Sequence, residues 1–168
     1  GINNKSGKPS FDEVKRILDF AYSNNIKFLD TAEAYGNSHQ VIGKYHRESS
    51  NRFNIITKFS PGRKDLPQNI QERVLKDIEI LGTESLYCYM FHSFDDYQKY
   101  YRVFENDLSL LKRKGKIIKI GVSLYDNFEV EKVLQNGAIG LIQIPFNLLD
   151  NNSKRSKVLK LAKQASLE

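Results

Sequence analysis

The sequence has one cysteine and no long apolar run, and both shortages narrow the class of protein. The single thiol, Cys88, cannot form an intrachain disulfide, which suits a reducing cytoplasm. A membrane-spanning helix needs about 20 consecutive apolar residues, and no run approaches that length. The opening residues 1–10 are polar, unlike a secretory signal. We therefore expect a cytoplasmic globular protein with no membrane partner.

Metal-binding and phosphate-binding motifs are also missing. The chain has only three histidines, His39, His46 and His92, and they form no His-x-His or His-x-x-x-His pair. We therefore expect no metal site. No Gly-x-Gly-x-x-Gly follows an expected strand, and no Gly-x-x-x-x-Gly-Lys-Ser/Thr occurs. This removes the two strongest phosphate-loop signals of doubly wound folds.

Acidic residues are in the minority, since 26 lysines and arginines face 20 acidic residues and leave a net charge of +6. The densest basic runs are 112–116 and 154–157. The first ends a helical pattern before a glycine, where cations suit the helix dipole. We interpret the second as the solvated face of a helix. Neither has interleaved aromatic residues or a binding motif, so we expect no nucleic-acid partner.

Helical and strand-like patterns alternate along the whole chain. The expected strands are 26–30, 53–58, 86–91, 117–122 and 141–144. The first expected helix begins at Phe11, after a capping box formed by Ser10 and Glu13. Three more are expected over 38–45, 67–81 and 97–114, the last of them capped by Asp95 and Asp96. A fifth follows Asp126, and a sixth contains Val158 to Ala162 near the end of the chain. Such alternation predicts parallel strands joined by right-handed crossovers in one α/β domain over residues 1–168. A doubly wound sheet and a (β/α)8 barrel both fit this pattern.

Polar residues stand where the expected strands end, which is where parallel β/α folds gather their functional groups. They are Asp30 and Tyr35, Lys58, His92, Ser123, and Gln143 to Asn147. A tyrosine has an ordinary pKa near ~10, and a nearby ammonium would lower it. A carboxylate would hold the lysine, and a histidine would align a carbonyl. Such a set can protonate an oxygen that is gaining negative charge, which is half of a carbonyl reduction.

These residues lie in segments that resemble the aldo-keto reductases. The resemblance covers nearly the whole chain, in the family's order. It rests on Leu-Asp-Thr-Ala at 29–32, Tyr-Gly-Asn-Ser at 35–38, Ile-Gly at 42–43, Ile-Thr-Lys at 56–58, Tyr-Met-Phe-His at 89–92, Ile-Gly-Val-Ser at 120–123 and Gln-Ile-Pro-Phe-Asn at 143–147.

The resemblance implies a catalytic role for four residues. Tyr35 would be the general acid, and Lys58 would lower its pKa. Asp30 would pair with Lys58, and His92 would orient the carbonyl group. Hydride would pass from NADPH, or from NADH, to the aldehyde or ketone of a small carbonyl substrate.

The resemblance also implies a cofactor pocket. Ser123 and Gln143 would hydrogen-bond the nicotinamide carboxamide. Leu124 stands where the family often has asparagine, so one carboxamide contact would be either lost or replaced by Asn147 or water. His39 stands where the family often has glutamate, a change that we expect to affect only a helix start.

The implied fold is a (β/α)8 TIM barrel, which needs about 250 residues. With 168 residues, a start at Gly1 and a single methionine at Met90, we expect an incomplete barrel holding about strands two to six. The main alternative function is a non-catalytic cofactor-binding or regulatory subunit on the same scaffold. A nucleic-acid-binding role rests on charge alone. The particular substrate and the oligomeric state stay open.

Overall fold

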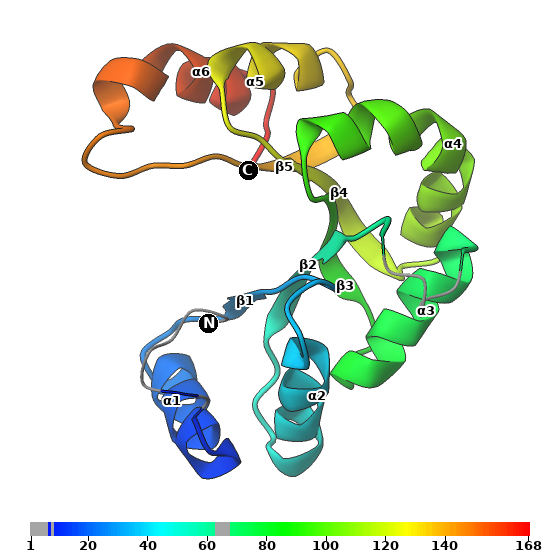
Figure 1. Ribbon diagram of the computed structural model, residues 1–168, viewed down its shortest axis with the longest axis vertical. Coiled ribbons are helices and arrows are strands. Elements are labelled where there is room, and N and C mark those ends of the chain that lie inside the picture. The colour runs from blue at the N-terminus through cyan, green and yellow to red at the C-terminus, as the bar shows by residue number, and fades with distance from the viewer. Residues whose placement is uncertain (1–6, 8, 63–67) are drawn as a thin grey trace.

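The computed structural model describes residues 7, 9–62 and 68–168 (Figure 1). Its strands are β1 (Phe28–Asp30), β2 (Asn54–Phe59), β3 (Leu86–Phe91), β4 (Ile117–Ser123) and β5 (Ile139–Gln143). Its helices are α1 (Phe11–Ser23), α2 (Ser38–Glu48), α3 (Ile70–Leu81), α4 (Phe94–Arg113), α5 (Asn127–Val133) and α6 (Asn152–Gln164). Strand and helix alternate as the sequence predicts. Pro67, the expected start of α3, lies outside the described residues.

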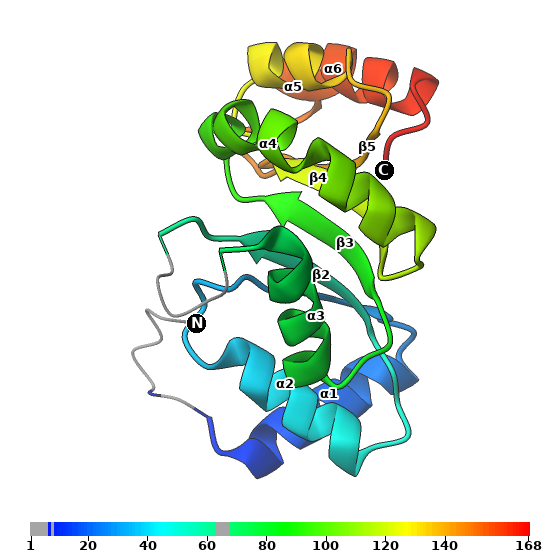
Figure 2. The same cartoon turned by 90° about the vertical axis from the view of Figure 1, so that its right-hand side faces the viewer.

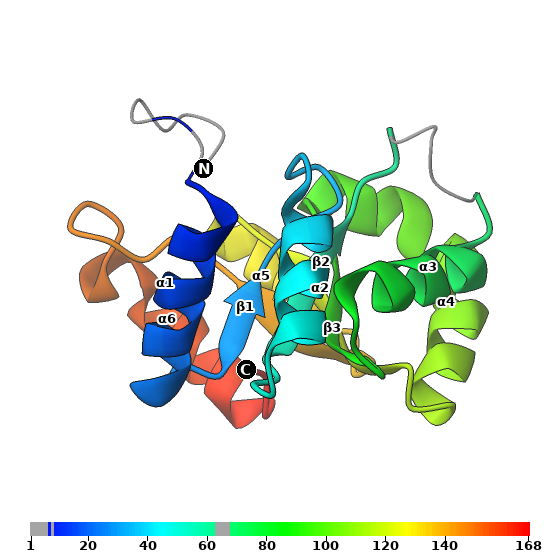
Figure 3. The same ribbon diagram turned by 90° about the horizontal axis from the view of Figure 1, so that it is seen from below.

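The sheet is parallel, and its strand order β1-β2-β3-β4-β5 follows the order of the chain. A doubly wound sheet would reverse direction part of the way through, and this one does not. Because each right-handed crossover steps the same way, the helices cover one side of the sheet. Figures 1 and 2 show the strands curving into an open arc with the helices outside. Seen from below, α1 and α2 lie on either side of β1 (Figure 3).

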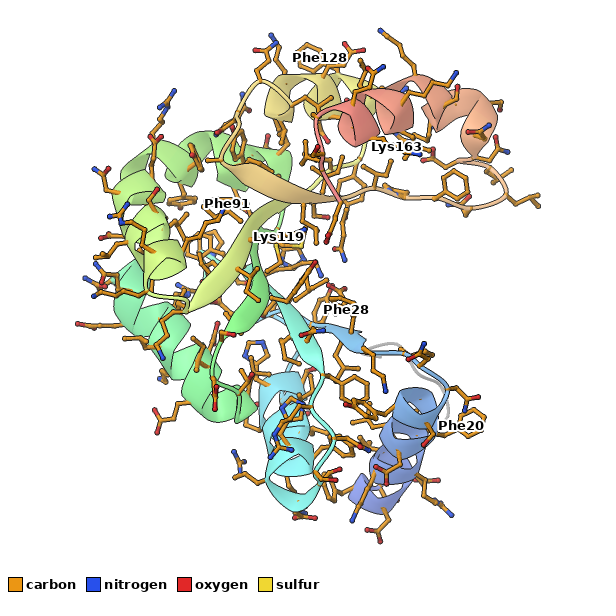
Figure 4. The ribbon with its side chains drawn as sticks, turned by 180° about the vertical axis from the view of Figure 1, so that it is seen from behind. Phe20, Phe28, Phe91, Lys119, Phe128 and Lys163 are labelled. Carbon is orange, nitrogen blue, oxygen red and sulfur yellow. The ribbon has the colours of Figure 1, made fainter. Side chains whose placement is uncertain are left out.

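The two faces of the arc carry different side chains. Between sheet and helices lies a large apolar core, in which the Phe91 ring packs edge-on against Tyr97 and Tyr101 of α4. The concave face carries a smaller cluster of Cys88, Met90 and Leu141. Figure 4 shows Phe91 toward α4 and Lys119 toward the concave side. Cys88 is fully buried there, as expected for a small core residue.

The helix ends follow local sequence signals, with one correction. The Ser10–Glu13 capping box is confirmed, and Asp126 forms a second box with Glu129. The helix expected to begin at 97 begins at Phe94 instead. Its cap is Ser93, whose side chain accepts a hydrogen bond from the Asp96 amide at 3.1 Å. Asp95 and Asp96 therefore lie inside the first turn, where their charges favour the helix dipole.

Helices α2 and α3 touch at a glycine. A Cβ atom added at Gly43 would stand 1.8 Å from the carbonyl oxygen of Ile80. No side chain larger than hydrogen fits there unless one helix moves. We predict that Gly43→Ala lowers the free energy of unfolding by about 3 kcal/mol or more, because overpacking displaces backbone and not a flexible side chain.

Urea unfolding followed by circular dichroism measures this loss. Gly137→Ala is the matched control, because a Cβ there meets no atom within 4 Å. Its effect should stay within about 0.5 kcal/mol. Equal stability of the two variants would show that α2 and α3 do not approach this closely.

Candidate active site

The polar residues expected at the strand ends lie at one edge of the sheet. Asp30, Ser123 and Gln143 are the last residues of β1, β4 and β5. Lys58 is the penultimate residue of β2, and His92 directly follows β3. Because the strands are parallel, their carboxyl ends meet at this edge. Tyr35 reaches it from the loop between β1 and α2.

A short ion pair forms the base of the site. Lys58 Nζ lies 2.5 Å from Asp30 Oδ1, and the lysine side chain is only 4% exposed. The same ammonium donates to the carbonyl oxygen of Thr31 at 3.2 Å. A buried ammonium is costly without a partner, so these two contacts explain how a lysine can be accommodated at this strand end. The predicted pairing of Asp30 with Lys58 is present.

The first and last strands of the sheet meet at that carboxylate. Gln143 Nε2 at the end of β5 donates to Asp30 Oδ1 at 3.0 Å. Asp30 Oδ1 therefore receives hydrogen bonds from both Lys58 and Gln143. This contact joins a residue expected in the cofactor pocket to the proposed catalytic pair.

Tyr35 lies above this pair, beside His92. The centroid of its ring is 5.7 Å from Lys58 Nζ, and the rings of Tyr35 and His92 meet edge-on with centroids 6.0 Å apart. Tyr35 is 39% exposed, so a molecule in solution can reach it. The structure thus brings Asp30, Tyr35, Lys58 and His92 together.

One electrostatic expectation is wrong. Partial burial and the charge of Asp30, with a contribution from Tyr125, raise the pKa of Tyr35 above its ordinary value of 10.0. The resemblance implied that Lys58 would lower it. Burial of the phenol is the larger cause of the rise, and the Asp30 carboxylate, which contacts Lys58 at 2.5 Å, adds to it, so the pKa rises although Lys58 lies nearby. Tyr35 therefore keeps its proton at neutral pH.

His92 is electrostatically distinct from a surface histidine. Burial lowers its pKa below the ordinary 6.5, and the positive charge of Lys58 lowers it further. The imidazole is therefore neutral at pH 7. A neutral ring can donate one hydrogen bond to a carbonyl oxygen, but it is not an imidazolium that would transfer a proton to that oxygen in place of Tyr35.

A hollow of about 270 Å³ opens beside this cluster, at the ends of β4 and β5. It is lined by Ser123, Leu124, Tyr125, Gln143, Ile144 and Pro145. A hydroxyl and a primary amide on an otherwise largely apolar wall suit the hydrogen-bonding pattern of a carboxamide. Ser123 and Gln143 thus offer this hollow groups that could hydrogen-bond a carboxamide.

Asn147 does not line this hollow. Its Oδ1 accepts the backbone N–H of Leu149 at 2.9 Å and that of Asp150 at 3.1 Å, which stabilises the turn between β5 and α6. Leu124 is fully buried, and its amide donates to the Gln143 carbonyl at 2.8 Å. The structure therefore gives Asn147 a local partner, and its expected contact with the carboxamide stays a prediction.

Two residues at this edge escaped sequence reasoning. Tyr125 lines the hollow and raises the pKa of Tyr35; an aromatic residue just after the strand-end serine was the available signal. The interpretation of the run 154–157 as a solvated helix face is wrong for Arg155. It is fully buried and donates to Asp150, to Asn127 at 2.8 Å and to the Tyr125 carbonyl at 2.6 Å. Arg155 thereby ties α6 to the loop that holds the hollow.

The described residues offer neither a metal-binding cluster nor a membrane-spanning helix. Over residues 7, 9–62 and 68–168, no group of three His, Cys, Asp or Glu side chains could hold a metal ion. Within the same part of the chain, none of the helices combines the length and apolar character that crossing a bilayer requires.

The sequence of this chain matches the model of a known protein family. The sequence model of the Aldo/keto reductase family matches residues 1–167. Aldo-keto reductase str7 of Strobilurus tenacellus is 25% identical over 162 residues, covering 92% of this chain and 48% of that protein. An NADH-specific methylglyoxal reductase of Escherichia coli (strain K12) is 26% identical over 160 residues, covering 82% of this chain and 48% of that protein. The chain thus spans about half the length of these curated relatives.

Solved structures share the fold. An aldo-keto reductase from Pseudomonas aeruginosa superposes with a TM-score of 0.75 at 22% identity, covering 95% of this chain and 65% of that one. One from Klebsiella pneumoniae in complex with NADPH gives 0.71 at 19% identity, covering 94% and 56%. The expected (β/α)8 fold is confirmed, and the open five-stranded sheet corresponds to an incomplete barrel.

The influence of Lys58 on His92 can be measured. We predict that the His92 imidazole titrates below pH 6.5 and that Lys58→Met raises its midpoint toward that value, because removal of the cation makes the imidazolium less unfavourable. NMR of the histidine ring resonances against pH reports both midpoints.

His46 is the internal control. Its pKa is also lowered, but by burial and by Arg52, so Lys58→Met should leave its midpoint in place. A His92 midpoint that stays fixed or falls in this variant would contradict the assigned electrostatics.

Proposed function

The chain belongs to the aldo/keto reductase family, and we propose that its full-length protein is an NAD(P)H-dependent oxidoreductase that reduces an aldehyde or ketone to an alcohol. One observation carries this proposal: Asp30, Tyr35, Lys58 and His92 converge from the ends of three neighbouring strands, beside a hollow lined by a hydroxyl and a primary amide.

NADPH is the cofactor that we propose, with NADH as the other possibility. A bound reduced nicotinamide would supply a hydride. Ser123 and Gln143 would hold its carboxamide, since both line the hollow and both carry hydrogen-bonding groups. A structural relative was crystallised with NADPH, whereas a curated relative is NADH-specific, so the family supports either choice.

Tyr35 would act as the general acid. Its raised pKa keeps the phenol protonated, and a carbonyl oxygen that gains negative charge becomes basic enough to take the proton. The neutral His92 ring, edge-on to Tyr35, would orient that oxygen. The Lys58 ammonium, 5.7 Å from the Tyr35 ring centroid, would favour the phenolate left behind, and so would act against burial and the Asp30 charge, which raise the pKa of the phenol.

Removal of the Tyr35 hydroxyl tests the assignment. We predict that Tyr35→Phe lowers kcat at least ~100-fold with a simple aldehyde, the usual contribution of a positioned acid, while cofactor affinity persists. Turnover is followed by cofactor absorbance, and affinity by fluorescence titration.

Tyr100→Phe serves as the control, because this tyrosine lies on α4 and packs against Phe59 and Phe104 in the outer core. Its kcat should match that of the unchanged protein. Near-normal turnover by Tyr35→Phe would show that another group is the acid. Cofactor binding without turnover by the unchanged protein, over a panel of aldehydes, would favour a non-catalytic subunit.

The proposed contact between Ser123 and the cofactor can be tested separately. Ser123→Ala should weaken binding of the reduced cofactor about 2- to 12-fold, which corresponds to the loss of one hydrogen bond of about 0.5–1.5 kcal/mol. Ser109→Ala on α4 is the matched control and should bind normally. Unchanged affinity in Ser123→Ala would place the carboxamide elsewhere.

A further inference from the structure

We propose that Glu33 and Arg73 form a buried clamp that positions the Tyr35 loop against the Lys58 strand, so that both act as positioning residues for catalysis. This inference rests on the proposed reductase function. It concerns a cluster on the helix side of the sheet, behind the proposed active site, where neither residue can touch a substrate.

The clamp is built around one carboxylate. Arg73 Nε donates to Glu33 Oε1 at 2.8 Å, and a second guanidinium nitrogen donates to Oε2. Tyr89 Oη donates to Oε1 at 2.9 Å, and the amide of Ser60 donates to Oε2 at 2.7 Å. Glu33 is 4% exposed and Arg73 is 2% exposed. Four donors from three other segments thus fix the carboxylate in a single position.

These contacts join the elements that carry the proposed catalytic groups. Glu33 lies in the loop after β1, two residues before Tyr35, and its amide donates to the Lys58 carbonyl at 3.2 Å. Ser60 directly follows β2, two residues after Lys58, and its carbonyl accepts a hydrogen bond from Arg73 at 2.5 Å. The guanidinium of Arg73 also lies 4.7 Å from the Phe59 ring centroid. The loop of Tyr35 and the end of β2 are therefore held by the same two side chains.

A turn carries the position of Glu33 on to Tyr35. The Tyr35 amide donates to the Ala32 carbonyl at 2.9 Å, and the Ser38 amide at the start of α2 donates to the Tyr35 carbonyl at 3.1 Å. Tyr35 is therefore anchored on one side by the clamp and on the other by α2. Since the Glu33 amide bonds the Lys58 carbonyl and Ser60 lies two residues after Lys58, movement of the clamp would change the Lys58 to Tyr35 distance.

Overall stability does not account for this arrangement. A buried ion pair loses most of its attraction to desolvation, and apolar side chains of similar volume are often as stable. Burial raises the pKa of Glu33, although the hydrogen bonds from Arg73 act in the opposite direction. Burial likewise raises the pKa of Tyr89 well above 10.0, so its hydroxyl remains a donor. What the pair supplies beyond an apolar contact is directional bonding at fixed points.

The test uses Glu33→Gln and Arg73→Lys in the full-length protein. Glu33→Gln replaces an acceptor oxygen by an amide that faces donors, and Arg73→Lys keeps the charge but loses the two-pronged contact. We expect each variant to lower kcat at least about tenfold, since displacement of a proton donor by about 1 Å has effects of this order. KM for the aldehyde and the dissociation constant for the cofactor should change less than about threefold, because the hollow lies on other strands.

Leu108→Ala separates positioning from destabilisation. Leu108 is 1% exposed in the core under α4, so its truncation lowers the melting temperature without touching the clamp. Its kcat per folded molecule should match the unchanged protein. An equal loss of kcat in Leu108→Ala, or a normal kcat in Glu33→Gln, would overturn the proposal. Tyr89→Phe removes a single hydrogen bond to Glu33 and is the second variant. If Glu33→Gln fails to fold, Tyr89→Phe must show a reduced kcat for the proposal to stand.

Amide hydrogen exchange tests the clamp without turnover. The Ser60 and Tyr35 amides should exchange faster in Glu33→Gln and at the normal rate in Leu108→Ala. Unchanged exchange would overturn the clamp even if the protein reduces aldehydes. Faster exchange in a protein that reduces no aldehyde would instead overturn the reductase proposal and leave the clamp supported.

Discussion

The ion pair between Lys58 and Asp30 is the contact on which the candidate site depends. An ammonium at the end of a buried strand requires a compensating charge, and Asp30 supplies it at 2.5 Å. The same carboxylate accepts from Gln143 at 3.0 Å, so it also joins the first strand of the arc to the last. Its effect reaches further, because it raises the pKa of Tyr35, whereas the ammonium that it holds lowers the pKa of His92. Burial is the larger cause of both shifts; Asp30 adds to the one at Tyr35, and Lys58 adds to the one at His92.

The topology of the sheet explains why these groups meet at all. With strands ordered as in the chain and crossovers of one hand, every strand ends at the same edge and every helix packs on the same side. The concave side near that edge receives the Lys58–Asp30 pair, and the helix side receives the Glu33–Arg73 pair. The two ion pairs lie on neighbouring segments, so the geometry of the proposed acid depends on both.

Much of the fold and of the site could be predicted from sequence. The alternation of helix and strand, the Ser10 cap and the placement of Asp30, Lys58 and His92 at strand ends all follow from local pattern. The two failures have different causes, one tertiary and one local. Arg155 stands in a basic run that looks solvated, yet Asp150 and the Tyr125 loop enclose it. Ser93 caps α4 although two aspartates follow it, because its side chain reaches the Asp96 amide.

The sequence by itself determined the order of the elements, the hydrophobic face of each and the polar residues that follow the strands, because these depend on neighbours within a few positions. Only the tertiary structure decided which charge each polar group faces. The Glu33–Arg73 contact spans 40 positions and the Asp30–Gln143 contact spans 113. A pKa, a buried guanidinium or a shared carboxylate depends on distance in space and on the exclusion of water, and neither can be read from spacing along the chain.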